Sequence, residues 1–258
     1  MSDRPNTDGS REFVSTVMSR AELLERLEES QTVRELADEL SMARSTVHRV
    51  TESLEEHDLV EKPNEHIEHT GLGTVVAAEL QTLRTKLEAA QRLEPFLNTL
   101  NGEVTDIPLE RFTDVTVTQS QHRQAHVGAK RITDLIERTD SLRMFSSIIS
   151  PLYVDVALRE MLNGTEIDVI FDQEIIGVVA EQYYDQAQEA LETGRFGLHM
   201  TDDVPFELFL FDDRMGMAAH DDDGIARAFV ESTDPAAREW AESLYAEYAS
   251  EAETVTFG

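Results

Sequence analysis

The stretch that most constrains this chain is residues 32–54, which reads as two short helices joined by a tight turn. Apolar residues recur at helical spacing in both halves, and Ser41-Met42 marks the corner between them. The inner faces comprise Leu36, Ala37 and Leu40 in the first half and Val47, Val50 and Leu54 in the second. This pattern predicts a helix-turn-helix whose second helix turns small and basic side chains outward.

Small and basic side chains on the second helix are what a reader of the DNA major groove needs. The stretch from Leu40 to Thr51 contains no Asp or Glu, although the 258-residue chain has 52 of them. A chance gap at a short turn is the alternative explanation. The candidate DNA-binding residues are Arg44, Ser45, Thr46, His48 and Arg49, with Lys62 from the segment that follows.

The charge of the chain argues against this interpretation. The net charge is -30, whereas a DNA-binding protein is expected to be basic. Either the chain avoids nucleic acid, or it works in molar salt, where charges are screened beyond ~3 Å. Lysine is scarce and the acids are spread evenly, which favours the second explanation. In this respect the composition resembles that of haloarchaeal cytoplasmic proteins, and we expect a cytoplasmic protein.

Several classes of protein are excluded by what the sequence lacks. It has no cysteine, which rules out disulfides, thiolate chemistry and cysteine metal sites. It has no apolar run near 18 residues and no apolar segment in its first residues, so we expect no transmembrane helix and no signal peptide. We expect no metal site, no cofactor and no membrane partner.

The elements around the helix-turn-helix predict a winged helix. Residues 1–10 should be a disordered tail. Ser19 and Glu22 fit a capping box that opens a helix. The predicted helices cover residues 20–29, 33–40 (with Thr32 as N-cap) and 44–57, and Pro63-Asn64 separates two extended pieces at 59–62 and 66–70.

The N-terminal segment also resembles a known family. SRAELLERL, TVRELADELSMARSTVHRVTESLEEHDLVEK and the closing His-Thr-Gly-Leu-Gly are similar to the winged helix of archaeal transcription regulators, and ARSTVHRVTESLEEHDLV is the most specific piece. The family usually has Ser or Thr as N-cap of the recognition helix. This chain has Ala43 there, and Ser41 is the alternative cap.

A long helical pattern follows the predicted wing. Val76, Leu80, Leu83 and Leu87 are spaced by four, three and four residues, as in a short coiled-coil seam. We interpret residues 72–100 as a connecting and dimerisation helix, because winged helices commonly bind two-fold sites as dimers. A helix packed on its own domain is the alternative.

Beyond Asn101-Gly102, strands and helices alternate, which predicts a mixed sheet that is parallel in its first half and antiparallel at its end. We expect strands at 115–118, 142–147, 166–171, 196–200, 207–211, 215–220 and 225–231, and helices at 123–138, 151–163, 175–191 and 235–250.

In order and length this half resembles the effector domain of haloarchaeal regulators related to TrmB, to the methanogenesis and filament regulators and to the TbsP-like regulators. The resemblance implies a phospholipase-D-like fold. The His-x-Lys signature of the lipases is absent from this chain, so we expect no enzyme activity.

A second acid-free stretch, residues 115–133, suggests a ligand site. Arg123, His126 and Lys130 would share one helix face. Ser146, Ser147 and Ser150 would lie where a strand ends and a helix begins, a position that favours anions. These six residues would bind a small, anionic, phosphorylated metabolite. The alternative is a solvated basic helix with an ordinary N-cap.

The sequence thus predicts a two-domain chain of the α+β and α/β class. Its parts would be a tail (1–10), a winged helix-turn-helix (11–71), a connecting helix (72–100) and a mixed-sheet α/β effector domain (101–258). We expect a regulator that binds double-stranded DNA as a homodimer in a salt-rich cytoplasm. The alternatives are an enzyme on the C-terminal half and a winged helix that only pairs proteins.

Overall fold

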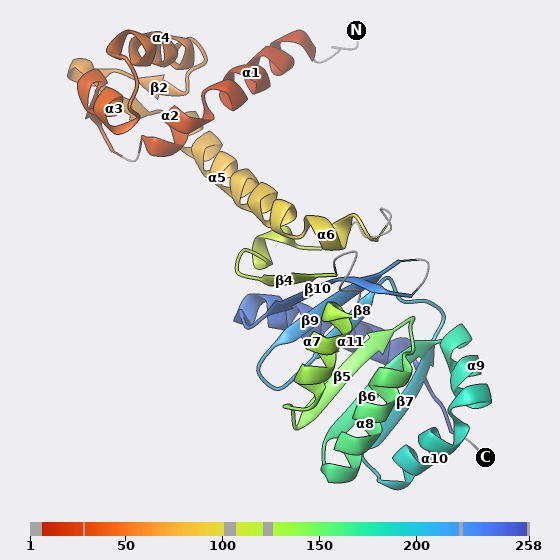
Figure 1. Ribbon diagram of the computed structural model, residues 1–258. Coiled ribbons are helices and arrows are strands. Elements are labelled where there is room, and N and C mark those ends of the chain that lie inside the picture. The colour runs from red at the N-terminus through yellow and green to blue at the C-terminus, as the bar shows by residue number, and fades with distance from the viewer. Residues whose placement is uncertain (1–6, 28, 101–106, 121–125, 222–223, 257–258) are drawn as a thin grey trace, which may run out of the picture. The chain divides into compact units, whose positions relative to one another are not determined.

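The computed structural model describes residues 7–27, 29–100, 107–120, 126–221 and 224–256. The chain forms two compact units, residues 1–86 and 87–258. The division falls within α5 (Gly71–Arg92), inside the segment that the sequence assigns to a connecting helix (Figure 1). Each unit is described separately below.

The N-terminal unit joins short helices to a small antiparallel sheet. Within its described residues the strands lie in the order β1-β3-β2. Its elements are α1 (Thr7–Ser19), α2 (Ala21–Arg26), β1 (Gln31–Thr32), α3 (Val33–Glu39), α4 (Arg44–Glu55), β2 (Val60–Glu61), the 3-10 turn η1 (Pro63–Glu65), β3 (His66–His69) and the first part of α5.

The core of this unit confirms the predicted inner faces of α3 and α4. Leu36, Val47 and Leu54 are completely buried, and Leu40 packs against them from the edge. Thr32 caps α3 as predicted. The Thr32 hydroxyl accepts a hydrogen bond from the Glu35 amide, and the Glu35 carboxylate accepts one from the Thr32 amide. That backbone hydrogen bond lowers the pKa of Glu35.

The beginning of the chain differs from the prediction. Residues 7–10 belong to α1 rather than to a tail, and residues 1–6 lie outside the described part. The predicted capping box at Ser19 is wrong, because the Ser19 hydroxyl donates to the Thr16 carbonyl at 3.0 Å and Arg20 is the N-cap of α2. Val17 on α1 is buried in the core, so this helix has a packed face.

The turn between α3 and α4 shows which residue is the N-cap of α4. Ser41 has a φ of 54°, in the left-handed region, and takes no part in capping. Ala43 is the N-cap of α4, with extended backbone and no side-chain hydrogen bond. Helix α4 begins at Arg44, as predicted.

The C-terminal unit is built on a mixed sheet, which confirms the predicted α/β class. Within the described residues the sheet has eight strands in the order β11-β7-β6-β5-β8-β9-β10-β4, with β5, β6 and β7 parallel and the other pairs antiparallel. Its strands are β4 (Thr116–Gln119), β5 (Ser141–Ser146), β6 (Glu166–Asp172), β7 (Phe196–Thr201), β8 (Glu207–Leu210), β9 (Met215–His220), β10 (Ala226–Ser232) and β11 (Glu253–Thr254).

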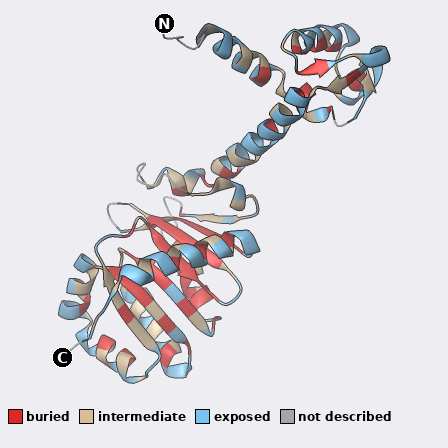
Figure 2. Ribbon diagram, turned by 180° about the vertical axis from the view of Figure 1, so that it is seen from behind, coloured by how far each residue is buried: buried red, intermediate tan, exposed pale blue. Residues whose placement is uncertain are grey.

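Helices cover both faces of this sheet. Helices α7, α8, α9 and α10 pack on one face, and α6 and α11 on the other. The strands between them are largely buried (Figure 2). The helices of this unit are α6 (Glu94–Leu97), η2 (Leu109–Arg111), α7 (Val127–Ile136), α8 (Pro151–Asn163), α9 (Gln173–Gln182), α10 (Tyr184–Glu192) and α11 (Pro235–Glu251).

The limits of two predicted helices can be compared with the structure. Helix α8 begins after Ser150 and ends at Gly164, whose φ of 122° suits glycine, and both limits agree with the prediction. The segment expected to be one helix at 175–191 is two, α9 and α10, with a break at Tyr183. In the part of the chain that the structure describes, no helix combines the length and apolarity needed to cross a membrane.

Candidate functional site

The outer face of α4 carries the candidate residues predicted from the sequence. Arg44, Ser45, His48 and Arg49 are exposed, and together they are called the α4 surface below. Thr46 is half-buried at the edge of this surface. The opposite face of α4 is held in the core by its buried apolar residues. The helix therefore has one packed face and one free face.

The charges on the α4 surface are only partly balanced by neighbours. His48 Nδ1 lies 3.3 Å from Glu52 Oε1, and both side chains are more than half exposed, at 61% and 55%. Among the described residues, neither Arg44 nor Arg49 forms an ion pair. The surface thus offers two guanidinium groups without an acidic partner.

Lys62 is placed less favourably than the sequence suggested. Its ammonium donates a hydrogen bond to Glu55 Oε2 at 2.8 Å, and only 23% of its side chain is exposed. It precedes the η1 turn, where Asn64 and Glu65 have positive φ values. The charge of Lys62 is therefore balanced within the unit.

The predicted seam on α5 is not a continuous exposed stripe. Leu80 is buried in the core of the N-terminal unit, and Val76 packs against that core. Leu83 and Leu87 remain exposed, at 40% and 58%. The alternative of a helix packed on its own domain is thus correct for the first half of the seam. Leu83 and Leu87 form the free α5 pair referred to below.

The predicted anion site is not assembled by the described residues. Arg123 lies outside them, and His126 is the exposed N-cap of α7. Lys130 is paired with Asp134 at 3.2 Å. Ser147 and Ser150 line two different cavities. The five described members of the set therefore do not converge on one ligand.

Arg131, which follows Lys130 in the acid-free stretch, forms an ion-pair cluster with Arg214 and the buried Glu231. Arg131 donates two hydrogen bonds to Glu231, each 2.7 Å long, and Arg214 donates a third at 2.8 Å. Burial would raise the pKa of Glu231, but the hydrogen bonds from the two arginines lower it overall. This cluster ties α7 to β9 and β10 and is structural.

A group that the sequence analysis missed is the buried carboxyl of Glu207. This residue begins β8 and its side chain is 1% exposed. Its Oε1 lies 2.6 Å from Ser146 Oγ at the end of β5, and its Oε2 lies 3.1 Å from His220 Nε2 at the end of β9. Oε2 has no hydrogen-bond partner of good geometry among the described residues. A single acid in an otherwise apolar strand was the signal for it.

The hydrogen bonds of Ser146 indicate that this carboxyl is protonated. Ser146 Oγ accepts from the Ile148 amide at 2.9 Å, and it lies within 2.8 Å of the Ile148 carbonyl and 2.6 Å of Glu207. A hydroxyl has one proton, which cannot serve both oxygens. All three contacts are satisfied when Glu207 carries a proton and donates it to Ser146.

Desolvation acts in the same direction. Burial raises the pKa of Glu207 to about 8, because desolvation penalises the charged carboxylate. Burial also lowers the pKa of His220 to about 4. Both groups are therefore uncharged near neutral pH, and the 3.1 Å contact joins two neutral side chains.

Glu207 and His220 line a cavity of about 340 Å³ at one edge of the sheet. We call it the Glu207 cavity. The C-terminal ends of β5 and β9 and the beginning of β8 meet there. The other lining residues are Thr99, Leu100, Ser147, Ile148, Pro205, Phe206, Ala218, Ala219 and Asp221. The volume falls in the range of small-molecule sites.

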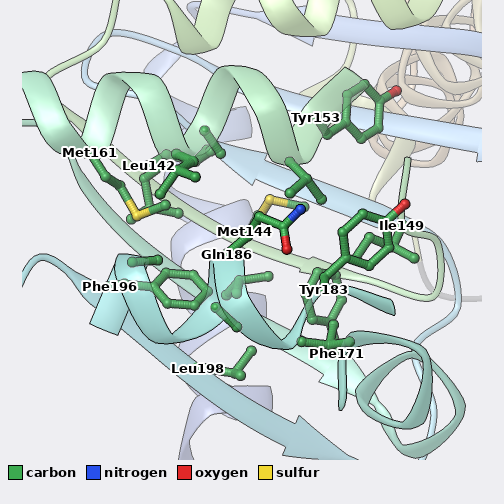
Figure 3. A pocket seen from close by; sticks show the side chains of 18 of the residues that line it. Leu142, Met144, Ile149, Tyr153, Met161, Phe171, Tyr183, Gln186, Phe196 and Leu198 are labelled. Carbon is green, nitrogen blue, oxygen red and sulfur yellow. The ribbon is translucent and has the colours of Figure 1, made fainter. Parts of the chain in front are cut away.

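A second cavity, of about 100 Å³, lies between the sheet and the helices α8, α9 and α10. Figure 3 shows Met144 and Gln186 side by side among the lining residues, which also include Met161, Tyr153 and Tyr183. Its walls are almost wholly apolar. It therefore lacks the convergent polar groups that fix the orientation of a polar ligand.

Comparisons with known proteins agree with this architecture. Residues 8–92 match the model of the HVO_A0261 N-terminal domain, and residues 126–251 match the model of the middle domain of the methanogenesis regulatory protein FilR1. Each model matches less than half of the chain, and the two matches lie in different halves. Together they support a FilR1-type regulator. The chain matches none of the curated proteins.

Solved structures show more distant likenesses. TrmBL2, described as an archaeal chromatin protein with a novel mode of DNA binding, is 17% identical over 92% of each chain, with a TM-score of 0.44. Nuc from Salmonella typhimurium, a phospholipase D family member, is 12% identical over 56% of this chain and 100% of its own, with a TM-score of 0.46. At these TM-scores neither likeness carries an argument about function.

Proposed function

We propose that this chain is a transcription regulator that binds double-stranded DNA through the α4 surface. The observation that carries the proposal is the pair of exposed guanidinium groups on α4 that form no ion pair within the described part of the chain. They lie in the acid-free stretch of a chain of net charge -30. Helices α3 and α4 would form the helix-turn-helix, and β2 and β3 the wing.

The α4 surface supplies groups for both kinds of DNA contact. Arg44, at the N-terminus of the helix, can reach a base edge, where an arginine binds guanine through two hydrogen bonds. Arg49, five residues further on, would contact phosphate, and Ser45 and His48 would share the groove. Thr46 lies at the edge, and Lys62 would contribute little because Glu55 balances its charge.

A dimer through α5 would place two such surfaces on one site. The free α5 pair exposes two leucines one turn apart, and Leu72 and Val75 on the same helix are also exposed. Exposed large apolar side chains on one helix favour a second copy of the chain as their partner. A two-fold DNA site with two related half-sites would follow.

We further propose that the protein works at high salt. A net charge of -30 on 258 residues would repel DNA in dilute buffer. In molar salt the repulsion between charges more than ~3 Å apart is largely screened, so short-range contacts can determine binding. The acidic composition is then compatible with DNA as the partner.

The C-terminal domain would sense a ligand rather than catalyse a reaction. Ser146 is a buried hydroxyl whose neighbour is Glu207 and not His220, so the arrangement has no serine-histidine pair to activate a nucleophile. A polar cavity in a domain joined to a DNA-binding unit suits an effector. The regulated genes would then respond to a small metabolite.

Selection from a random DNA pool tests the proposal. The full-length protein, in about 2 M KCl, should enrich a motif with two-fold symmetry, because a dimer presents two α4 surfaces. Circular dichroism on the same sample reports whether the protein is folded. A folded protein that enriches no sequence after repeated rounds would overturn DNA recognition as its function.

A further inference from the structure

We propose that the Glu207 cavity binds a small organic molecule through a protonated amine, with the ammonium group against Glu207. This inference rests on the proposed regulator function only in that the ligand would act as its effector. The binding site itself is argued from the geometry of the cavity. It replaces the phosphorylated ligand that the sequence analysis expected.

The lining of the cavity is unsuitable for an anion. Two of its residues, Glu207 and Asp221, carry carboxyl groups, and none of its described lining residues is Lys or Arg. Arg227, the partner of the lining residue Asp221, already has its charge balanced by that carboxylate. A phosphate would therefore meet carboxyl oxygens without a compensating cation, which is costly in a buried site.

The same lining suits a ligand that carries a hydrogen-bond donor. Glu207 Oε2 is a buried acceptor that lacks a hydrogen-bond partner of good geometry among the described residues, and such groups are rare in folded proteins. Ser147 adds a hydroxyl, and Phe206 and Leu100 offer apolar surface for a short carbon chain. An ammonium group has three N–H donors and a positive charge, so it satisfies Oε2 and favours the ionised carboxylate.

Binding should therefore release a proton. The neutral carboxyl of the empty site becomes a carboxylate beside the ammonium, and its proton goes to solvent. The titratable groups that face Glu207 are His220 on β9 and Tyr153 on α8, with Asp221 beyond His220. Burial lowers the pKa of His220 and raises that of Tyr153, so both remain neutral at pH 7. Asp221 is paired with Arg227. Glu207 is therefore the source of the proton.

Calorimetric titration of the full-length protein with ethanolamine tests the proposal. Ethylene glycol is the neutral analogue of similar size, and inorganic phosphate is the anionic probe. Ethanolamine has four heavy atoms, so a dissociation constant near the millimolar range is expected. Titration in two buffers of different ionisation enthalpy should reveal release of about one proton, and affinity should rise up to about tenfold per pH unit from pH 6 to pH 8.

Two variants separate this role from a structural one. Glu207→Gln keeps a donor for Ser146 but cannot ionise, so ethanolamine affinity should fall more than tenfold and proton release should vanish. Glu166→Gln makes the same change at an exposed position on β6 and should bind like the wild type.

The remaining outcomes count against the proposal. Binding of phosphate or ethylene glycol as tight as that of ethanolamine would overturn it. So would ethanolamine binding that Glu207→Gln leaves unchanged, or no ethanolamine binding by the folded wild type. None of these results touches DNA recognition, because the titration contains no DNA and the selection experiment contains no amine.

Discussion

The α4 surface and the Glu207 cavity place charge in opposite ways. On α4 the charged groups are exposed, and Arg44 and Arg49 have no ion pair among the described residues. In the cavity the carboxyl is 1% exposed and held neutral by burial. The charges of the first surface are in contact with water and ions, whereas the Glu207 carboxyl is buried.

This difference predicts which solution variable governs each site. Interactions between exposed charges weaken as the salt concentration rises, because the Debye screening length falls to ~3 Å at 1 M salt. A buried carboxyl is screened much less, and its state follows pH through its shifted pKa. Salt should therefore act mainly on the α4 surface and pH mainly on the cavity. The four predictions below test this contrast.

Removal of both free arginines should have the largest effect. In Arg44→Ala with Arg49→Ala, loss of a bidentate base contact costs on the order of 1–3 kcal/mol and loss of a phosphate contact about 1 kcal/mol more. A dimer loses these contacts twice. Fluorescence anisotropy with the selected DNA site should show a loss of several orders of magnitude in affinity.

The matched control changes the charge equally but elsewhere. Arg138→Ala with Arg195→Ala removes two exposed arginines from the C-terminal unit. If this control weakens binding as much as the α4 variant does, net charge and not the α4 surface governs DNA affinity. The control should instead stay within about threefold of the wild type, as expected for screened charges.

Charging the free α5 pair should have the second largest effect. Leu83→Glu with Leu87→Glu places four like charges in a two-fold interface, so light scattering should show a monomer. DNA affinity should fall by about a hundredfold as the second contact is lost. Leu152→Glu with Leu162→Glu, two exposed leucines on α8, is the control and should leave the mass unchanged. A wild type that is itself monomeric at micromolar concentration contradicts the dimer.

The contrast between the regions also explains what the sequence could reveal. The helices of the N-terminal unit follow a 3.6-residue period, and the acid-free stretch on α4 is contiguous, so both are visible in the sequence. The alternation of the second half likewise predicted the mixed sheet. These features depend on residues that are neighbours along the chain.

The Glu207 cavity could not be found in this way. Ser146 and Glu207 are 61 residues apart, and they meet only because β8 pairs antiparallel with β5. The first half of the predicted α5 seam was misassigned for a related reason, since Leu80 has the spacing of a coiled coil but is buried by the core of its own unit. Period alone does not say which partner covers a face.

The effect of pH on stability should be of intermediate size. The folded state keeps the proton of Glu207 up to about pH 8, whereas the unfolded chain loses it near the ordinary pKa of 4.5. The unfolded state therefore binds fewer protons in this range, and stability falls as pH rises, by at most ~1.4 kcal/mol per pH unit. The lowered pKa of His220 acts oppositely between pH 6.5 and about pH 4, because there the unfolded imidazole binds a proton that the folded one does not. The fall in stability is therefore expected mainly from pH 6.5 to pH 8.

Glu207→Gln removes the first of these dependences. The variant should match the wild type within about 1 kcal/mol at pH 5 and exceed it by a few kcal/mol at pH 8. Urea unfolding followed by circular dichroism in molar KCl measures both values. Parallel pH profiles for the two proteins would show that Glu207 is ionised in the folded state, contrary to the proton count at Ser146.

The smallest expected effect is that of salt on DNA affinity. DNA affinity normally falls by orders of magnitude over such a salt range, because binding releases counterions condensed on the DNA. Here the net charge of -30 opposes binding, and added salt screens that repulsion while cations can enter between acidic protein and phosphate. The two trends oppose each other, so affinity should stay flat or rise from about 0.5 M to about 2 M KCl. Anisotropy titrations across this range, with circular dichroism at each point, separate binding from folding. A steep loss of affinity in a protein that stays folded would mean that ordinary phosphate contacts dominate and that the acidic surface does not set the interaction.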